Sequence, residues 1–443
     1  MNRREFIFGS AVLTASAAAA KTAKQARGDA GKTEKDAAPR PLIVSAPMLQ
    51  NHSETSVGVA FAVSAMANGY VEYSTDPELR RKVKVMCGGY RVTDMNDKIM
   101  LVRLRGLKPA TKYYYRIGAD RIDYQNGYKM NRVGTEVDRR VYSFTTAGSR
   151  AEGSFAVIND THANWKPFEM VIEKVEEIDP ACVVWNGDAT NCEETIDRHV
   201  RIFLNPEIKR RDYASCRPYS IVAGNHEVRG MAGRQLERAW MFRDPEERLA
   251  RDWDLGRNFA VRQGDIAMIG LDTGEDKGDK DWRFAGLFVS EPYRVAQTEW
   301  LKDALRRPEI ASAPYLVAFC HIPIFYSNET ENKKSADPRL EALKTDYMYW
   351  QKECGRMWGP LLERAGCQLV ISAHMHRFQL HKPSAFCRWA QIVGGGPKLG
   401  APETGLFPTV IEGRVSDGAL DVIVHDAFNK RIAERCRFKP RKT

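Results

Sequence analysis

Five separated clusters of Asp, Asn and His residues have the chemistry of a hydrolytic metal site. Imidazole, carboxylate and amide oxygen are ligands that Zn, Mn and Fe accept in proteins. Together the clusters supply enough donors for two ions that share one carboxylate. Two ions ~3.5–4 Å apart can clamp a phosphoryl group and activate water near neutral pH. The clusters are Asp160-Thr161-His162, Gly187-Asp188, Gly224-Asn225-His226-Glu227, His321 and His374-Met375-His376.

Each cluster follows an apolar run that predicts a short buried strand. Ligands of open α/β sheets bind at the carboxyl ends of the strands, so side chains far apart in the sequence are expected in one pocket. Side chains alternate along an extended strand, which predicts that His374 and His376 point to one side, as Asp160 and His162 also do. The runs are Ser154–Ile158, Ala181–Trp185, Tyr219–Ala223, Pro314–Cys320 and Cys367–Ser372.

Taken singly, none of these clusters is specific. Asp-x-His is more often a helix cap or a solvated pair, Gly-Asp is common in turns, and a lone His after a strand is usually a polar strand end. Gly-Asn-His-Glu and His-x-His are moderately specific. The prediction rests on the order of all five clusters after β-like runs, and five of the nine His residues fall within them.

Strands alternate with helical stretches from residue 152 onward. Apolar side chains between residues 167 and 178 follow the spacing of one helical face, and Gly366 is expected to end a helix around Trp358–Ala365. The tail returns to β structure in Thr409–Val415 and Leu420–His425, joined by a turn. This order predicts an α/β (α+β) domain with a mixed sheet over residues 152–436.

Residues 41–147 have the pattern of an all-β module. Apolar and polar residues alternate in Val57–Val63 and Lys98–Leu104, and Tyr142–Thr146 would be the last strand,. The segment Leu107–Tyr113 resembles the L-x-P-x-T-x-Y signature of fibronectin type III sandwiches. The resemblance implies that Tyr113 makes a corner by hydrogen-bonding its hydroxyl to nearby backbone.

The first 20 residues have the pattern of an export signal. Arg3 and Arg4 precede an apolar stretch that ends in Ala18-Ala19-Ala20, as in twin-arginine signals. Residues 21–40 are charged, small and aperiodic, which predicts a disordered linker. The expected location is therefore outside the cytoplasm of a bacterium, in the periplasm or secreted.

Composition narrows the classes of partner. The formal net charge of +10 suits anionic partners such as phosphate esters,. Lys and Arg are spread along the chain, so nucleic acid is not expected as a partner, except for nucleotides as substrates. Nine Cys residues at irregular spacing, with no CxxC pair, exclude a disulfide framework and a thiolate zinc site,. No internal apolar run reaches the ~18 residues of a spanning helix. The oligomeric state stays open.

The ordered motifs resemble those of the calcineurin-like metallophosphoesterase superfamily over about residues 152–400. Those motifs are D-x-H, G-D, G-N-H-[DE], H and [GA]-H-x-H. The resemblance implies a four-layer α/β/β/α catalytic sandwich with two divalent or trivalent metal ions, Fe, Mn or Zn. It implies a first ion held by Asp160, His162, Asp188 and His376, and a second held by Asp188, Asn225, His321 and His374, with Asp188 shared.

The same resemblance implies hydrolysis of phosphate monoesters by in-line attack of a hydroxide that bridges the two ions. His226 would lie outside the metals and assist the departing alkoxide, a role that suits imidazole near neutral pH. Glu227 is expected to orient neighbouring groups, and Arg229 and His381 are expected at the surface. Two alternatives stay open. One is a phosphodiesterase acting on nucleotides or lipid head groups, and the other is a non-catalytic surface-binding protein with a metal-stabilised scaffold.

A β-sandwich ahead of such a catalytic domain resembles the layout of purple acid phosphatases, but two residues depart from their pattern. Those enzymes have Gly where this chain has His162. They also have a Tyr ligand three positions after the shared Asp, where this chain has Asn191. The iron–tyrosinate colour and the substrate preference of that family are therefore not expected here.

Overall fold

The computed structural model describes residues 40–88, 97–242, 255–325, 353–385 and 387–441. The expected export signal and almost all of the expected linker, residues 1–39, lie outside the described residues. The fold lies within the compact unit Leu42–Thr443. No helix within the described ranges is long and apolar enough to cross a membrane.

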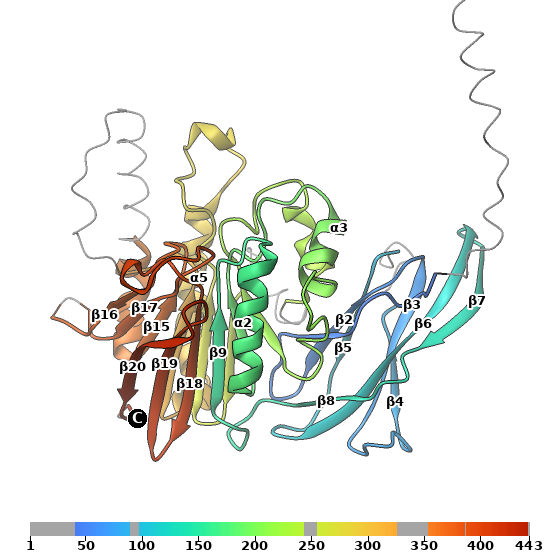
Figure 1. The fold of residues 1–443 in the computed structure, drawn as a ribbon, viewed down its shortest axis with the longest axis horizontal. Helices are drawn as coiled ribbons and strands as arrows, with labels where there is room; N and C mark the ends of the chain where they lie inside the picture. Colours follow the sequence, from blue (N-terminus) through green and yellow to red (C-terminus); the bar gives the residue numbers. More distant parts are fainter. Residues whose placement is uncertain (1–39, 89–96, 243–254, 326–352, 386, 442–443) are drawn as a thin grey trace, which may run out of the picture. The chain divides into compact units, whose positions relative to one another are not determined.

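The described residues before position 146 form β-strands that pack as a sandwich (Figure 1). Strands β1 (Met48–Gln50), β2 (Val57–Ala62) and β5 (Ile99–Leu104) lie in one sheet. The second sheet contains β3 (Ala67–Ser74), β4 (Val83–Met86), β6 (Lys112–Asn126), β7 (Lys129–Val137) and β8 (Tyr142–Thr145). Buried side chains such as Val59, Phe61 and Tyr115 form one core between them. The predicted β-sandwich is confirmed.

The predicted tyrosine corner is present. The backbone N–H of Lys108 donates to the Tyr113 hydroxyl at 2.9 Å. The Tyr113 ring is buried and stacks on Phe144 of β8, with ring centroids 5.8 Å apart. The hydroxyl therefore joins the start of β6 to the loop before it, as the sequence signature predicts.

The first catalytic sheet is continuous with one sheet of the sandwich. Its order is β20-β19-β18-β9-β10-β11-β1-β2-β5, and β1 pairs in parallel with β11 through Gln50 and Tyr219. This pairing crosses the expected domain boundary between residues 147 and 152. The catalytic strands are β9 (Ser154–Ile158), β10 (Val183–Asn186), β11 (Tyr219–Val222), β18 (Thr409–Ser416), β19 (Ala419–Asp426) and β20 (Arg431–Phe438).

A second catalytic sheet has the order β12-β13-β14-β15-β17-β16. Neighbouring strands from β13 to β17 in this order are parallel, and β12 and β16 are antiparallel edge strands. The strands of this sheet are β12 (Phe259–Gln263), β13 (Ile266–Leu271), β14 (Tyr315–Cys320), β15 (Leu369–Ser372), β16 (Gln379–His381) and β17 (Ala390–Val393). Strands β13, β14, β15 and β17 are buried along their length, which explains their continuous apolar runs.

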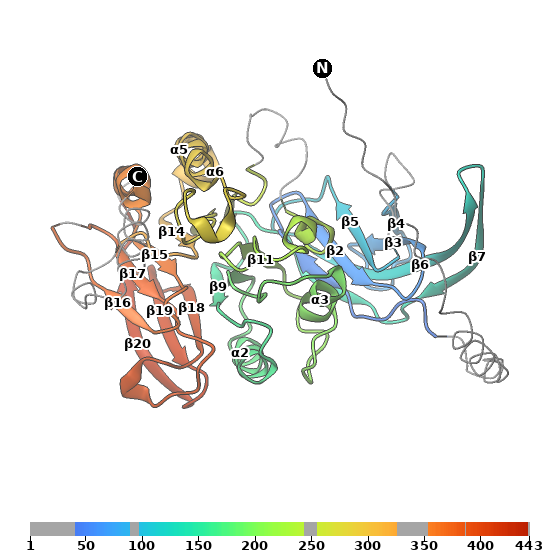
Figure 2. The same cartoon turned by 90° about the horizontal axis from the view of Figure 1, so that it is seen from above.

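Helices cover the outer face of each catalytic sheet (Figure 2). Helix α2 (Trp165–Ile178) packs Phe168 and Val175 against the first sheet. Helix α5 (Ser290–Arg306), helix α6 (Pro308–Ala311) and a helix over residues 353–364 cover the second sheet. Val157 and Val184 of the first sheet meet Val317 of the second in a core between the sheets. This arrangement confirms the four-layer α/β/β/α fold.

Short elements fill the connections. They are α3 (Ile196–His199), the π-helical turn η2 (Val200–Leu204), and the 3₁₀ turns η3 (Gly233–Arg238), η4 (Trp282–Phe284) and η6 (Pro402–Thr404). The helix over residues 353–364 ends as predicted, because Gly366 has φ +68° and its N–H donates to the Glu363 carbonyl at 3.0 Å,.

The Tyr113 corner makes a prediction about stability. We expect Tyr113→Phe to lower the free energy of unfolding by about 1 kcal/mol, because the Lys108 N–H loses its acceptor while the ring stays packed,. Thermal or urea unfolding measures the change. The matched control is Tyr114→Phe on the opposite face of β6, which we expect to stay within about 0.5 kcal/mol of the wild type. Equal losses in both variants would contradict the corner.

Candidate metal centre

The seven predicted ligands meet where the two catalytic sheets present the carboxyl ends of their strands. The ligand atoms form two groups, and within each group all of them lie within 4.8 Å of one another. The two groups share Asp188. Asn225 joins the second group, since its Oδ1 lies 2.9 Å from Nδ1 of His374. These are the two sets that the motif resemblance implied, and their role as ligands stays a prediction. The first group is Asp160, His162, Asp188 and His376, and the second is Asp188, His321 and His374.

The expected alternation along extended strand ends is wrong. Strands β9 and β15 stop at Ile158 and Ser372, before the motifs begin. The ligands of these two motifs, together with Asp188, have left-handed backbone conformations instead. Such conformations cost free energy in non-glycine residues and persist only where the surroundings enforce them. These conformations turn the side chains of each motif toward the shared carboxylate. The φ angles are +47° at Asp160 and His162, +50° at Asp188, +70° at His374 and +52° at His376.

Asp188 is the shared carboxylate and is only 1% exposed. Its Oδ2 lies 3.2 Å from Nε2 of His321 and 3.6 Å from Nε2 of His162. Burial alone would raise the pKa of Asp188, but the rings of His321, His226 and His162 outweigh burial and hold that pKa well below its usual range. For the imidazole of His321 burial has the opposite effect and lowers the pKa. The carboxylates of Asp188 and Asp160 outweigh burial and raise that pKa to about 10. The pocket therefore stabilises positive charge at its centre.

Glu227 holds the backbone around Asp188. Its Oε2 accepts the N–H groups of Asp188 at 2.8 Å and Gly224 at 2.7 Å. Its Oε1 accepts the N–H of Thr190 at 2.9 Å and the Thr190 hydroxyl at 3.1 Å. The side chain is 1% exposed, so it is enclosed by these donors. This geometry agrees with the expected orienting role.

Asn186 joins the two sheets beside the site. Its side-chain N–H groups donate to the carbonyls of Cys320 and Ile371, both at 3.2 Å, at the ends of β14 and β15. The Asn186 carbonyl lies 2.9 Å from Nδ1 of His321. Because a carbonyl only accepts, Nδ1 of His321 carries a proton, and Nε2 is the nitrogen that faces Asp188. Once Nε2 loses its own proton, the ring is the tautomer that a metal ligand requires.

Gly187 allows the His321 ring to pack directly against the backbone. It has φ +81°, and a Cβ at this position would lie 2.3 Å from Nδ1 of His321. Only glycine avoids both the conformational cost and the collision. The Gly of the Gly-Asp motif therefore has a packing reason as well as a turn reason.

The donor set fits a pair of cations. Oδ1 of Asp160 is buried without a hydrogen-bond partner, although Oδ2 accepts from Asn159 at 2.7 Å and from the N–H of His374 at 3.1 Å. Nε2 of His162 and Nε2 of His376 lie 2.9 Å apart and aim at one another. A buried orphan carboxylate oxygen and two converging imidazole nitrogens are the atoms a cation would satisfy.

His226 lies beside the cluster and belongs to neither group of ligand atoms. Its Nε2 is 3.9 Å from Oδ2 of Asp188, and its ring meets the ring of His162 edge-on at 4.7 Å. Burial lowers the pKa of His226 to about 4, against the opposing effect of Asp188. An imidazole in this place can face a substrate atom without holding a metal.

The two departures from the purple acid phosphatase pattern are visible in the geometry. His162 contributes its Nε2 to the first group, 3.8 Å from Oδ1 of Asp160. Asn191 is exposed, and its backbone N–H donates to Oε1 of Glu193 at 3.1 Å. The first ligand group therefore contains the imidazole of His162 and contains no Tyr.

The sequence patterns did not predict several residues that the structure places at the site. Oδ2 of Asp276 lies 3.7 Å from Nε2 of His374, and Arg229 bonds to both Glu275 and Asp276. Arg229 was expected at the surface, but it is half-buried in this ion-pair cluster. The signal for the two carboxylates was their place just after β13. Asn186 was detectable only as the residue before Gly187.

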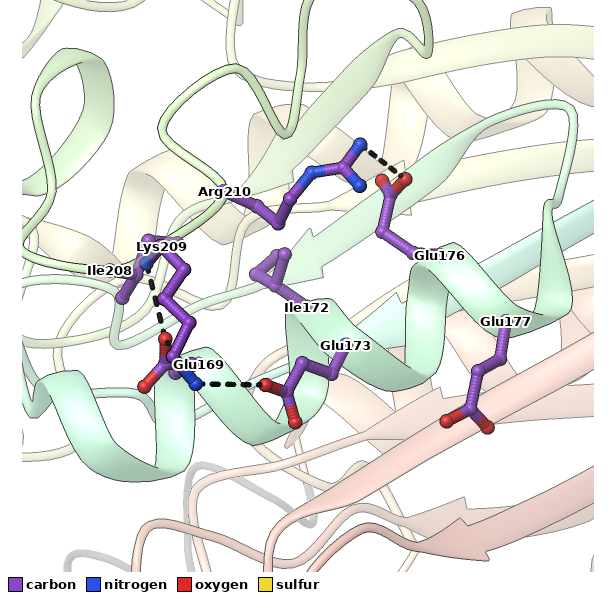
Figure 3. A pocket seen from close by; sticks show the side chains of 8 residues that line it. All are labelled: Glu169, Ile172, Glu173, Glu176, Glu177, Ile208, Lys209 and Arg210. Carbon is purple, nitrogen blue, oxygen red and sulfur yellow. Dashed lines mark hydrogen bonds and ion pairs between the residues drawn. The ribbon is translucent and has the colours of Figure 1, made fainter.

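The other His residues and the hollow in Figure 3 lie apart from this chemistry. His381 lies on β16, 5.6 Å from the ring of Phe325. The hollow has a volume of about 370 Å³ and is lined by acidic side chains of α2 with Lys209 and Arg210. Arg210 pairs with Glu176 at 3.0 Å, and Lys209 lies 3.7 Å from Glu169. It is a surface of ion pairs without a metal-type cluster.

Comparison with known proteins places this geometry in a family. The model of the calcineurin-like phosphoesterase family matches residues 153–378, slightly more than half of the chain. Purple acid phosphatase 21 of Arabidopsis thaliana is 24% identical over 65% of this chain and 54% of its own length. Probable purple acid phosphatase 20 of the same plant is 24% identical over 66% of this chain and 56% of its own length. The chain therefore spans about half the length of these curated relatives.

Solved structures share the fold at low sequence identity. Purple acid phosphatase PPD1 from yellow lupin (Lupinus luteus) seeds has a TM-score of 0.60 and 14% identity, and the match covers 89% of this chain and 74% of that one. PhoD has a TM-score of 0.57 and 12% identity, and the match covers 90% of this chain and 94% of that one. With the family motifs gathered at the facing edges of two sheets, the chain belongs to the calcineurin-like phosphoesterase family.

Proposed function

We propose that this chain is a two-metal phosphoesterase that hydrolyses phosphate monoesters. The observation that carries the proposal is the pair of ligand groups sharing the buried Asp188, with His226 beside them and outside both. The shared carboxylate is the feature of a two-metal site, and an unliganded imidazole at its edge suits a role toward the leaving group.

Each residue of the site would have a distinct role in this reaction. Bound ions would activate water for attack on phosphorus and offset the charge of the phosphoryl oxygens. Asp160, His162 and His376 would hold one ion, and Asn225, His321 and His374 the other, with Asp188 between them. Glu227 fixes the backbone of Asp188, and Asn186 fixes the His321 tautomer. His226 would donate a hydrogen bond from Nε2 to the departing oxygen.

The surroundings support a monoester as substrate. The rings of His226 and His376 each lie against His162, with centroids 4.7 and 4.8 Å away, so imidazoles form a contiguous edge. Arg229 and Lys277 are already paired with Asp276. A terminal phosphate offers three non-bridging oxygens to the bound ions, and His226, which belongs to neither ligand group, supplies a further donor at this edge,. The complete ligand sets disfavour a non-catalytic scaffold.

A substrate panel tests the proposed function. After chelation and add-back of Mn, Zn, Fe or Mg, we expect 4-nitrophenyl phosphate to be hydrolysed with a kcat/KM about tenfold above that of bis(4-nitrophenyl) phosphate, or ~1.4 kcal/mol of discrimination. Asp188→Asn should abolish both activities with the fold intact, because the shared ligand is lost. Asp179→Asn, at the exposed end of α2, is the matched control and should retain them.

Two outcomes of this panel would contradict the proposal. Faster hydrolysis of the diester would replace the monoesterase with a phosphodiesterase. Metal analysis that finds no transition metal bound, together with no hydrolysis of either ester, would favour the non-catalytic surface-binding protein.

Glu227 makes a second prediction about the same site. Glu227→Gln should lower the free energy of unfolding by about 3 kcal/mol and reduce the metal bound per chain, because an amide places N–H groups against backbone donors,. Thermal unfolding and elemental analysis measure these effects. Glu299→Gln on the exposed side of α5 is the control and should change neither. Unchanged metal content and stability in Glu227→Gln would refute the orienting role.

We also propose that the chain is exported through a twin-arginine signal. Arg3-Arg4 and the small apolar stretch ending at Ala20 support this proposal,. In bacterial cells, a fusion of residues 1–40 to a folded reporter should reach the periplasm and be shortened near Ala20. Replacing both Arg3 and Arg4 with Lys should retain it in the cytoplasm. Lys21→Ala with Lys24→Ala is the matched control and should export normally. Export that survives the Arg substitutions would overturn the proposal.

A further inference from the structure

A cysteine contacts the one imidazole that borders the metal groups without joining them. Sγ of Cys192 lies 3.2 Å from Nδ1 of His226. The other ring nitrogen, Nε2, is 3.9 Å from Oδ2 of Asp188. The two nitrogens of His226 therefore face different partners, a thiol on one side and the reaction centre on the other.

The turn that follows Asp188 holds Cys192 in this place. Cys192 has φ +61°, a left-handed conformation. The next residue, Glu193, is buried. Its carboxylate accepts hydrogen bonds from the backbone N–H of Asn191 at 3.1 Å and from the Nε–H of Arg198 at 2.9 Å. The thiol is thus carried on a turn that is fixed from both sides.

The loop that carries His226 is clamped to the same turn. The carbonyl of Glu193 accepts the N–H of Ala232 at 2.9 Å. Gly230, with φ +75°, comes so close that a Cβ there would lie 2.3 Å from this carbonyl. The distance between Cys192 and His226 is therefore set by backbone contacts rather than by side-chain freedom.

The position of the ring proton decides what His226 can do. A neutral imidazole has one N–H and one lone pair. With its proton on Nδ1, the ring would present only a lone pair to a departing oxygen. A thiol that donates to Nδ1 places the proton on Nε2. Burial raises the pKa of the Cys192 thiol, with Arg229 acting in the opposite direction, so the sulfur carries its proton near neutral pH.

We propose that Cys192 is a positioning residue whose S–H donates to Nδ1 of His226 and so fixes the tautomer that serves the leaving group. The inference rests on the proposed phosphoesterase function. As the phosphorus–oxygen bond breaks, its electron pair stays on the leaving oxygen. The Nε2–H group of His226 donates a hydrogen bond to that oxygen, and solvent supplies the proton of the released alcohol.

The contribution of Cys192 should depend on the leaving group. A nitrophenolate departs with little help, whereas an alkoxide is strongly basic and needs a donor. A hydrogen-bond donor aimed at charge that develops in the transition state contributes roughly 10²–10³-fold, and loss of the correct tautomer removes part of that. We expect Cys192→Ala to lower kcat/KM by about 30-fold for an alkyl phosphate, and by less than about 3-fold for 4-nitrophenyl phosphate.

Matched variants separate positioning from general damage. Cys192→Ser keeps a hydroxyl donor and should recover most of the activity on the alkyl ester. Cys216→Ala removes an exposed thiol and should change neither ester. In a His226→Asn background, Cys192→Ala should cause no further loss, because the two residues act as one unit. Equal losses on both esters, no recovery with Ser, or an additive loss with His226→Asn would overturn the proposal.

A second readout needs neither metal nor turnover. In metal-free protein with ¹⁵N-labelled His, assigned through His226→Asn, we expect His226 to show an acceptor Nδ1 and a protonated Nε2. Cys192→Ala should shift both signals toward a mixture of tautomers. A wild-type ring protonated on Nδ1 would overturn the proposal. Failure of the wild type to hydrolyse any ester would instead refute the proposed function, which the NMR result does not depend on.

Discussion

The buried carboxylate of Asp188 is the constraint on which the site depends. An ionised carboxylate removed from water costs several kcal/mol unless charged or hydrogen-bonding partners surround it. Here Oδ1 accepts the N–H of His226 at 3.0 Å, and Oδ2 faces the imidazoles of His321 and His162. The backbone N–H of Asp188 is held by Glu227. Partners from three motifs must therefore converge on one residue, which fixes where the strand ends of both sheets lie.

The same convergence explains the strained backbone of the motifs. Left-handed conformations in non-glycine residues cost about 1–3 kcal/mol each. The N–H of Asp160 donates to the Gly187 carbonyl at 3.0 Å, and the N–H of His162 donates to the Asp188 carbonyl at 2.9 Å. These bonds link two motifs through backbone alone, so the strain is compensated only when the strands are already side by side. Neither motif would hold this geometry in isolation.

Patterns with a single physical cause could be predicted from the sequence, and those with several could not. Ser154–Ile158 matches β9 because a buried strand needs an unbroken apolar run, whereas Ala181 and Cys367 were placed in strands that begin two residues later. The ligand residues were found because imidazole and carboxylate recur in order. Asp276, Asn186 and Cys192 were missed as partners of the site, because an isolated Asp, Asn or Cys acquires its role only from what the fold places beside it.

The expected boundary between sandwich and catalytic domain marks a change of pattern rather than a break in packing. Gln50, at the end of β1, donates to the Ala239 carbonyl at 3.0 Å and accepts the N–H of Met241 at 2.8 Å. The Tyr115 hydroxyl of β6 donates to the Ser215 carbonyl at 2.6 Å. Residues on both sides of the boundary thus satisfy one another's buried polar groups, and separation would leave them unpaired. Among the catalytic strands of the first sheet, β11 is the one that pairs with β1 of the sandwich. Since β11 comes just before Asn225 in the chain, the sandwich also supports that side of the metal centre.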